Sequence, residues 1–385
     1  MIGTEFIKGQ GLGNQLLAYV SARAIAKSHG FDFGCAGIDR LGINIHSNDG
    51  VNFLELDTGY EIPDEEIPNF KRYDEKEERI FVGNSVHDIT KGCYIAGADA
   101  KLLDGASCVD STFEASRNGE NSGGAILSDN TLLYGNLQAE EYFAPYMDEL
   151  QKWLKVKPEF DSKEFTKDNL CIINMRGGEY TDSPELFLEK NYWINGMKHM
   201  RKLRPDMEFV IITEDVETAH KILPGIPAYH FSVGKDYVTI KNATYLLLSN
   251  SSFAVLPAMT SDTCKYILAP KYWARHNVSN GYWASEQNIY TDWNYMDRKG
   301  RVFSAEECRK EIAAWKRKAG MVADGNLVNA TSELEIPAGM GASFGWKIPA
   351  HGIRKSLQLL RAKSIRIAYY GKRAARSLAR RIFNK

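Results

Sequence analysis

The hydrophobic pattern of this 385-residue chain predicts short buried strands that alternate with amphipathic helices. Near the N-terminus, the short run Glu5–Ile7 predicts a strand and residues 17–28 predict a helix, with a glycine-rich turn between them. Residues 132–134 predict a further strand, and helical spacing of the apolar positions predicts a helix over 139–156. This order of elements is typical of an α/β domain.

The alternation is clearer in the second half of the chain. Apolar runs predict buried strands at 170–173, 208–213 and 265–269. Helical spacing predicts helices at 192–204, 216–223 and 240–248. Strands that alternate with helices indicate a parallel, doubly wound sheet.

These patterns divide the chain into four parts. We predict an N-terminal α/β domain at 1–156 and a second, Rossmann-like domain at 165–318. Residues 319–352, rich in Gly, Ala and Pro, predict a linker, and residues 353–385 a basic amphipathic tail. A hydrophobic fraction of 44% and a charged fraction of 25% are ordinary globular values.

The tail carries an unusual share of the positive charge. Of the 48 Lys and Arg residues, 11 lie in 351–385, which contains no Asp or Glu, so the remainder holds 37 basic against 49 acidic residues. Apolar tail residues three or four positions apart favour a helix that lies on an anionic membrane. A solvated or oligomer-forming basic helix has the same pattern. The acidic remainder argues against nucleic acid as a partner.

Cysteine usage and the N-terminal sequence bear on the compartment. The six cysteines are scattered without C-x-x-C pairs or metal-ligand spacing, so we expect reduced, mostly buried thiols. No basic segment followed by an apolar run opens the chain, and no run of about 18 apolar residues occurs. We therefore predict a cytoplasmic protein, held peripherally on the inner face of the membrane by its tail.

The turn Gly9–Leu16 (GQGLGNQL) is the first candidate ligand site. A glycine-rich turn that opens a helix presents backbone N–H groups and the positive end of the helix to an anion. The dinucleotide fingerprint G-x-G-x-x-G is incomplete, since Asn14 stands at the third glycine. A turn without a ligand, or a dehydrogenase with Asp32 as ribose partner, remain alternatives.

Four blocks in order resemble the bacterial α-1,2-fucosyltransferases of glycosyltransferase family 11. Gly11–Leu16 (GLGNQL) is similar to the family's G-G-L-G-N-Q, and Gly135–Phe143 (GNLQAEEYF) is similar to G-Y-F-Q-S-E-K-Y-F. Asn174–Tyr180 (NMRGGEY) is similar to H-x-R-R-G-D-Y. The last block, Ser249–Phe253 (SNSSF) with Ile267–Trp273 (ILAPKYW), is similar to the pair S-N-S-S-F and I-A-P-K-x-W.

The resemblance implies a GT-B fold, in which two Rossmann-like domains face each other and the second holds the nucleotide sugar. It implies an inverting transfer of a deoxyhexose, L-fucose from GDP-fucose, to a hydroxyl of a glycan acceptor in surface-polysaccharide synthesis. The acceptor is then an oligosaccharide or a lipid-linked glycan. Asn174 and Gly177 stand where the signature has His and its second Arg. A different nucleotide sugar, or a non-catalytic protein that binds nucleotide sugars or glycans, therefore remain alternatives.

The blocks supply the candidate site residues. Arg176 follows a predicted strand, and its guanidinium suits a leaving diphosphate because it bonds two oxygens and keeps its charge. Glu179 is our preferred general base, although a nearby arginine stabilises the carboxylate and weakens it, and Glu140 and Glu141 are the other candidates. We assign Gln138 and Glu140 to the acceptor cleft. The expected donor-binding residues are Gly13, Asn14, Gln15, Asn174, Ser249, Ser251 and Ser252.

We expect no metal and no other cofactor, the nucleotide sugar being a substrate. The Asp-x-Asp pair that holds a divalent cation in GT-A transferases does not follow any predicted strand. Thr213–Asp215 resembles instead the S-D-D of the family, where the acidic residue is structural or adjacent to the nucleotide. Arg176 and helix dipoles would then neutralise the diphosphate.

Overall fold

The computed structural model describes residues 1–43, 50–75, 129–184, 186–277, 279, 283, 286–318, 322–323 and 326–327. These residues lie in one compact unit, Met1–Ile336. The predicted tail at 353–385 and most of the predicted linker at 319–352 lie outside the described residues. The predicted boundary between the two α/β domains stays a prediction.

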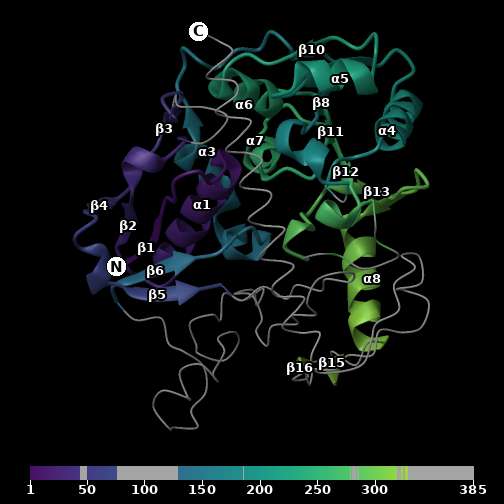
Figure 1. Ribbon diagram of the computed structural model, residues 1–385. Helices are drawn as coiled ribbons and strands as arrows, with labels where there is room; N and C mark the ends of the chain where they lie inside the picture. The colour runs from purple at the N-terminus through teal and green to yellow at the C-terminus, as the bar shows by residue number, and fades with distance from the viewer. Residues whose placement is uncertain are drawn as a thin grey trace. The chain divides into compact units, whose positions relative to one another are not determined.

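A five-stranded parallel sheet forms the first part of the chain, in the order β4-β2-β1-β6-β5 (Figure 1). Its strands are β1 (Ile2–Glu5), β2 (Phe33–Ala36), β4 (Tyr60–Ile62), β5 (Lys71–Asp74) and β6 (Thr131–Tyr134). The predicted bounds of the first strand, Glu5–Ile7, are wrong. The strand is Ile2–Glu5, and the chain leaves the sheet after Glu5, where its pairing with β2 ends.

Helix α1 (Leu12–Ser28) follows β1 and begins five residues before the predicted start, so the GLGNQL block forms its first turn. Thirteen of its residues are buried, which leaves little amphipathic contrast around the helix. A helix that is apolar on all sides is buried on all sides. Here α1 packs on β1 and also on η7 (Ser252–Ala254) and α7 (Val255–Met259), two elements of the second sheet's half.

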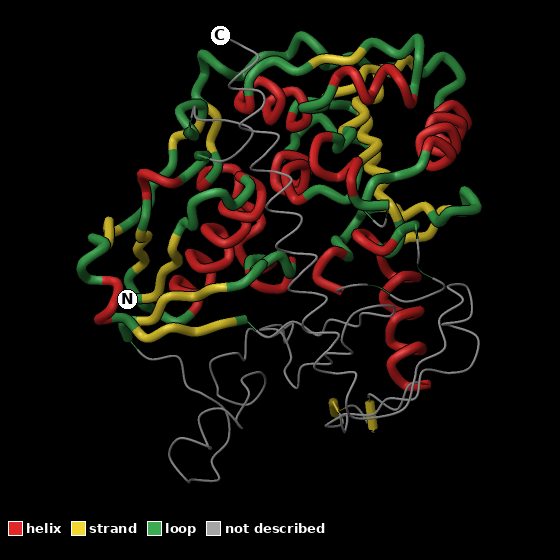
Figure 2. Tube along the Cα trace, viewed as in Figure 1, coloured by secondary structure: helices red, strands yellow, loops and turns green. Residues whose placement is uncertain are grey.

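The second sheet has seven strands in the order β10-β9-β8-β11-β12-β13-β14, all parallel except β14. The strands are β8 (Leu170–Asn174), β9 (Glu208–Ile212), β10 (Ala228–Tyr229), β11 (Tyr245–Leu248), β12 (Tyr266–Pro270), β13 (Asn294–Met296) and β14 (Val302–Ser304). Its other helices are α4 (Lys190–Leu203), α5 (Val216–Ile222), α6 (Val233–Lys241) and α8 (Ala305–Lys318). Figure 2 shows helices and strands alternating through this half. The predicted α/β class is confirmed, with one parallel sheet and one mainly parallel sheet.

Short elements complete the described chain. They are the ladders β3 (Leu54–Glu55) with β7 (Lys155–Val156) and β15 (Val322–Ala323) with β16 (Asn326–Leu327), helix α3 (Met147–Trp153), and the 3-10 turns η1 (Ile38–Arg40), η2 (Ile67–Asn69), η4 (Glu140–Tyr142), η5 (Ala144–Tyr146), η6 (Gly178–Asp182), η8 (Trp273–Arg275) and η9 (Glu286–Asn288). Of the four cysteines in the described part, Cys35, Cys171 and Cys308 are buried, as predicted, and all four are free thiols.

Two predicted helices are wrong. Residues 139–156 break into η4, η5, α3 and β7, since Pro145 lacks the N–H that a continuous helix would need there. Residues 240–248 hold only the end of α6 and then β11, because Tyr245–Leu248 pairs with β8 and β12 on both sides. The pairing of that apolar segment in the sheet overrides its helical spacing.

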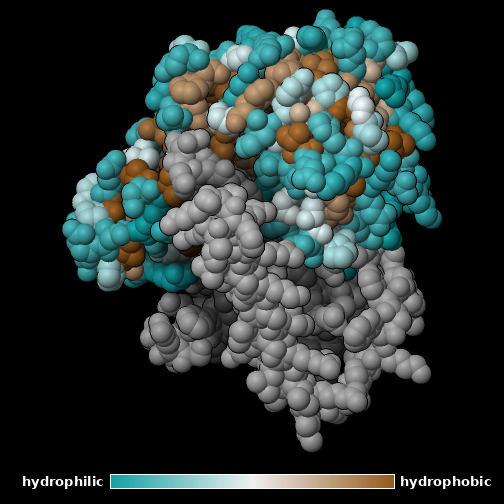
Figure 3. All heavy atoms as spheres, turned by 45° about the horizontal axis from the view of Figure 1, so that its top comes forward, coloured by the Kyte–Doolittle hydropathy of each residue, from teal (hydrophilic) through white to brown (hydrophobic). Residues whose placement is uncertain are grey.

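No helix among the described residues is long and apolar enough to cross a bilayer. On the face drawn in Figure 3, the described surface is mostly hydrophilic, with apolar side chains in small scattered groups.

Candidate functional site

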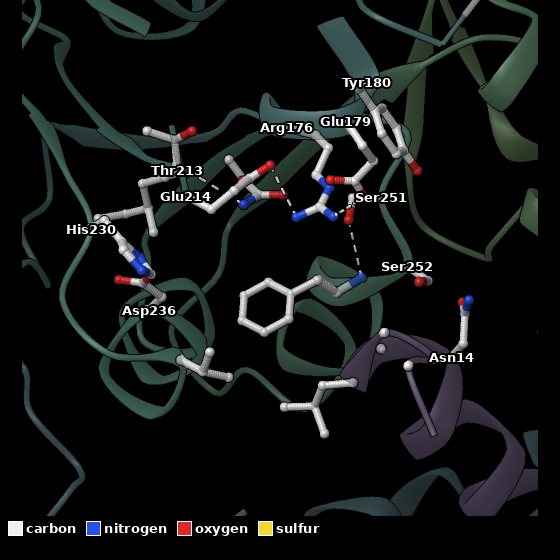
Figure 4. A pocket seen from close by; sticks show the side chains of 18 residues that line it. Asn14, Arg176, Glu179, Tyr180, Thr213, Glu214, His230, Asp236, Ser251 and Ser252 are labelled. Carbon is white, nitrogen blue, oxygen red and sulfur yellow. Dashed lines mark hydrogen bonds and ion pairs between the residues drawn. The ribbon is translucent and has the colours of Figure 1, made fainter. Parts of the chain in front are cut away.

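A pocket opens where the carboxyl ends of four strands of the second sheet meet the first turn of α1 (Figure 4). Residues that follow β8, β9, β10 and β11 line one side, and residues 9–14 line the other. The lining comprises Gly9, Gly11, Leu12, Gly13, Asn14, Asn174, Arg176, Glu179, Tyr180, Ile212, Thr213, Glu214, His230, Val233, Asp236, Ser251, Ser252 and Phe253.

The pocket lies at the point where the strand order reverses. From β8 the chain runs outward through β9 and β10, and β11 then returns to the other side of β8. The loop from β1 to α1 occupies the corresponding place in the first sheet, whose order reverses between β1 and β6. Open α/β sheets bind ligands in the crevice at such a switch point.

Arg176 lies at the centre of the pocket, two residues after β8, with 17% of its side chain exposed. Its Nη2 donates to Oε1 of Glu179 at 2.5 Å, and its Nη1 lies 3.0 Å from Oε1 of Glu214. Burial lowers the pKa of Arg176, but the carboxylates of Glu214 and Glu179 raise it further, so it rises overall. The guanidinium is therefore a fixed cation held between two carboxylates.

The loop after β9 holds the loop of Arg176. The backbone N–H of Gly177 donates to Glu214 Oε1 at 2.9 Å, and that of Gly178 donates to Asp215 Oδ2 at 3.1 Å. A Cβ on residue 177 would lie 2.6 Å from the Cβ of Asp215, so the second Arg of the signature has no room here. Two residues of Thr213–Asp215 therefore support the pocket. Glu214 pairs with Arg176, and Asp215 binds the backbone of Gly178 and also caps α5.

The SNSSF block contributes to the pocket in two ways. Ser249 is buried behind the pocket, where its N–H donates to Asn174 O at 2.9 Å and its Oγ lies 3.4 Å from Asn174 Oδ1. Ser251 accepts from the N–H of Phe253 at 3.3 Å, which caps η7, and both Ser251 and Ser252 line the pocket. Four donor-binding candidates therefore gather at the ends of β8 and β11, with Ser249 supporting Asn174.

Three consecutive residues of the GLGNQL block, Gly13, Asn14 and Gln15, have different roles. Gly13 approaches the backbone of Ser252 and Phe253 closely, since a Cβ there would lie 2.4 Å from Phe253 N. Asn14 lines the pocket, whereas Gln15 is fully buried and braces the loops around it. Its amide bonds the carbonyls of Ile7 and Arg40 and the N–H of Gly42.

The GNLQAEEYF block lies beside the pocket and not in its lining. Gln138 donates to Asn14 Oδ1 at 3.0 Å, so it positions a residue that does line the pocket. Glu140 is buried, where its Oε2 accepts from Thr291 at 2.8 Å and from Arg309 at 3.2 Å. Glu141 is half-buried and is not among the lining residues. Of the three candidate bases, Glu179 alone lines the pocket.

Two titratable lining residues, His230 and Asp236, lie outside the motif blocks and were missed from the sequence. Nδ1 of His230, just after β10, lies 2.7 Å from Oδ2 of the buried Asp236 in α6. Asp236 also accepts from the N–H of Phe231. Burial raises the pKa of its carboxyl, and this outweighs the lowering by the hydrogen bonds from Phe231 and His230. The only sequence signal was a single His after a two-residue strand, which is too short for hydrophobic periodicity to detect. No group of three or more His, Cys, Asp or Glu arranged to hold a metal occurs in the described part of the chain.

No protein-family model and no curated protein matches the sequence. Among solved structures, this chain is similar to the NodZ α-1,6-fucosyltransferase co-crystallised with GDP; the alignment covers 68% of this chain and 92% of NodZ, with 11% sequence identity and a TM-score of 0.34. The alignment with the fucosyltransferase NodZ from Bradyrhizobium covers 69% of this chain and 97% of that one, with 11% identity and a TM-score of 0.34. The alignment with POFUT1 in complex with GDP-fucose covers 68% of this chain and 96% of POFUT1, with 9% identity and a TM-score of 0.37. At these values the likeness assigns no role to any residue of this chain.

Proposed function

We propose that this chain is a glycosyltransferase that holds a nucleotide sugar in the Arg176 pocket and transfers a deoxyhexose to a hydroxyl of a glycan acceptor. The donor is GDP-L-fucose and the transfer inverts the anomeric centre, as the four family 11-like blocks imply. The acceptor belongs to surface-polysaccharide synthesis. The observation that carries the proposal is the position of Arg176, half-buried in a pocket at the switch point of a mainly parallel sheet.

The pocket suits an elongated donor with a diphosphate in the middle. Arg176 lies between His230 and Asp236 at one end and Asn14 at the other (Figure 4). The first turn of α1 contains no acidic residue, and the positive end of a helix favours an anion. We place the diphosphate at Arg176, the nucleoside toward His230 and the sugar toward Asn14, beside the first sheet's half of the pocket.

The reaction follows from that placement. The acceptor oxygen forms a bond to the anomeric carbon, and the bond from that carbon to the β-phosphate oxygen breaks. Its electron pair leaves on the diphosphate, where Arg176 stabilises the added charge without a metal. The proton of the acceptor hydroxyl goes to a carboxylate, for which Glu179 is placed best because it lines the pocket.

Donor identity is tested by thermal unfolding with GDP, UDP, ADP and their sugar conjugates. A ligand at about 100 times its Kd stabilises the folded state by about 2.7 kcal/mol, so the correct nucleotide raises the midpoint clearly. We expect GDP and GDP-fucose to give the largest shift, and EDTA to leave it unchanged. A larger shift with UDP or ADP would contradict the proposed donor.

Catalysis is tested separately, by GDP release from GDP-fucose in the presence of a panel of glycan acceptors, with and without EDTA. We expect acceptor-dependent release that EDTA does not abolish. GDP-fucose binding without release on any acceptor would favour the non-catalytic alternative.

For the tail at 353–385, the sequence alone supports a proposal. We propose that it binds an anionic membrane and brings the enzyme, on the cytoplasmic side, to a lipid-linked acceptor. Each basic residue near such a surface contributes about 1 kcal/mol, so deleting 353–385 is expected to abolish co-sedimentation with anionic vesicles and spare transfer to soluble acceptors. Vesicle binding that the deletion leaves intact, or that ignores salt, would contradict this role.

A further inference from the structure

Two carboxylates already bind the guanidinium that we assign to the diphosphate. Glu179 accepts from Nη2 of Arg176 at 2.5 Å, and Glu214 lies 3.0 Å from Nη1. Asp236 adds a third carboxyl to the lining, paired with His230. Among the lining residues that the structure describes, Arg176 is the one Lys or Arg, and its charge is already balanced by carboxylates. An incoming diphosphate is therefore repelled by these carboxylates, because like charges at such distances repel strongly.

The two carboxylates on Arg176 are held differently. Glu214 is 16% exposed, and the same oxygen that faces Arg176 also accepts from the N–H of Gly177, so it is anchored to the backbone. The side chain of Glu179 is 32% exposed and projects from the short turn η6, three residues after Arg176. Glu179 is therefore the more exposed of the two carboxylates, whereas Glu214 is tied to the loop that shapes the pocket.

We propose that Glu179 holds the place on Arg176 that a donor phosphate takes, and that the donor's diphosphate displaces it when the donor binds. The displaced carboxylate then accepts the proton of the acceptor hydroxyl as the sugar is transferred. This inference rests on the proposed function of Arg176. Its consequence is that the base becomes available only after the donor has bound, because a carboxylate held by a guanidinium is a poor proton acceptor.

An internal competitor weakens the apparent affinity for the ligand, since only the fraction of molecules with a released Glu179 binds. Removing the charge of Glu179 should therefore tighten the binding of the diphosphate and slow the transfer step. Loss of a merely structural residue would weaken both. This split distinguishes the proposed role from simple support of the η6 turn.

The test compares wild type, Glu179→Gln and Glu217→Gln by calorimetric titration with inorganic pyrophosphate and with GDP. Glu217 is 81% exposed on α5 and pairs with Lys221, so its variant removes the same charge away from the pocket. We expect Glu179→Gln to bind both probes about tenfold more tightly and its kcat to fall at least about a hundredfold. Glu217→Gln should match wild type in both. Glu179→Ala serves as a second variant if Glu179→Gln does not fold.

Pyrophosphate affinity that is unchanged or weaker in Glu179→Gln would overturn the inference, even if wild type still transfers fucose. Conversely, tighter pyrophosphate binding in a protein that never turns over GDP-fucose would support the competition at Arg176 and refute the proposed function. The two failures are therefore distinguishable.

Discussion

Arg176→Ala is expected to lower kcat/KM for transfer at least about a hundredfold, equivalent to about 2.7 kcal/mol of transition-state stabilisation. The variant loses the cation on which the leaving diphosphate depends, and the charges of Glu179 and Glu214 then face the donor without the guanidinium between them. Arg176→Lys should also lose more than about tenfold, because a point charge cannot bond a phosphate oxygen and Glu214 with the geometry of a planar fork. Steady-state kinetics with GDP-fucose measure both effects.

Arg204→Ala is the matched control for that loss. Arg204 pairs on the surface with Asp206, outside the pocket, and such exposed pairs contribute little to stability. We expect it to keep wild-type kcat/KM. If Arg176→Ala retained more than about a tenth of wild-type kcat/KM, Arg176 would not have the role assigned to it.

Gly13→Ala is expected to cost about 1–3 kcal/mol of folding free energy and to reduce transfer more than about tenfold. The added Cβ would lie 2.4 Å from Phe253 N and from the carbonyl carbon of Ser252. These are backbone atoms, which cannot rotate away as a side chain can, so α1 and η7 must separate. That movement displaces Asn14 on one side of the pocket and Ser252 on the other. Thermal unfolding and kcat/KM measure the two effects.

Gly11→Ala provides the control for stability. Gly11 has a φ of −63°, and a Cβ added there would meet open space out to 4 Å, so alanine fits without strain. Its unfolding midpoint should equal that of wild type. Equal midpoints and equal activity for Gly13→Ala would show that the close approach of α1 to η7 does not shape the site.

Much of the candidate site is readable from local sequence. Arg176 follows a continuous apolar run, and a buried parallel strand must deliver the residue after it to the ligand edge of the sheet. The glycines and Asn14 of the first turn stand out in the same way, because a strand, a glycine turn and a helix are all local patterns. The same holds for the α/β class and for β9, β12, α4 and α5.

The tertiary structure decided what local spacing leaves open. Residues 245–248 form a strand because β8 and β12 pair with them, and their spacing alone favoured a helix. Packing likewise determined that Gln15 is a buried brace and Glu140 a partner of Arg309, although both are polar residues inside motif blocks. His230, Asp236 and Glu214 reached the pocket from separate elements. Sequence periodicity reports which residues are buried, but long-range contacts determine which polar side chains meet, and those contacts exist only in the folded chain.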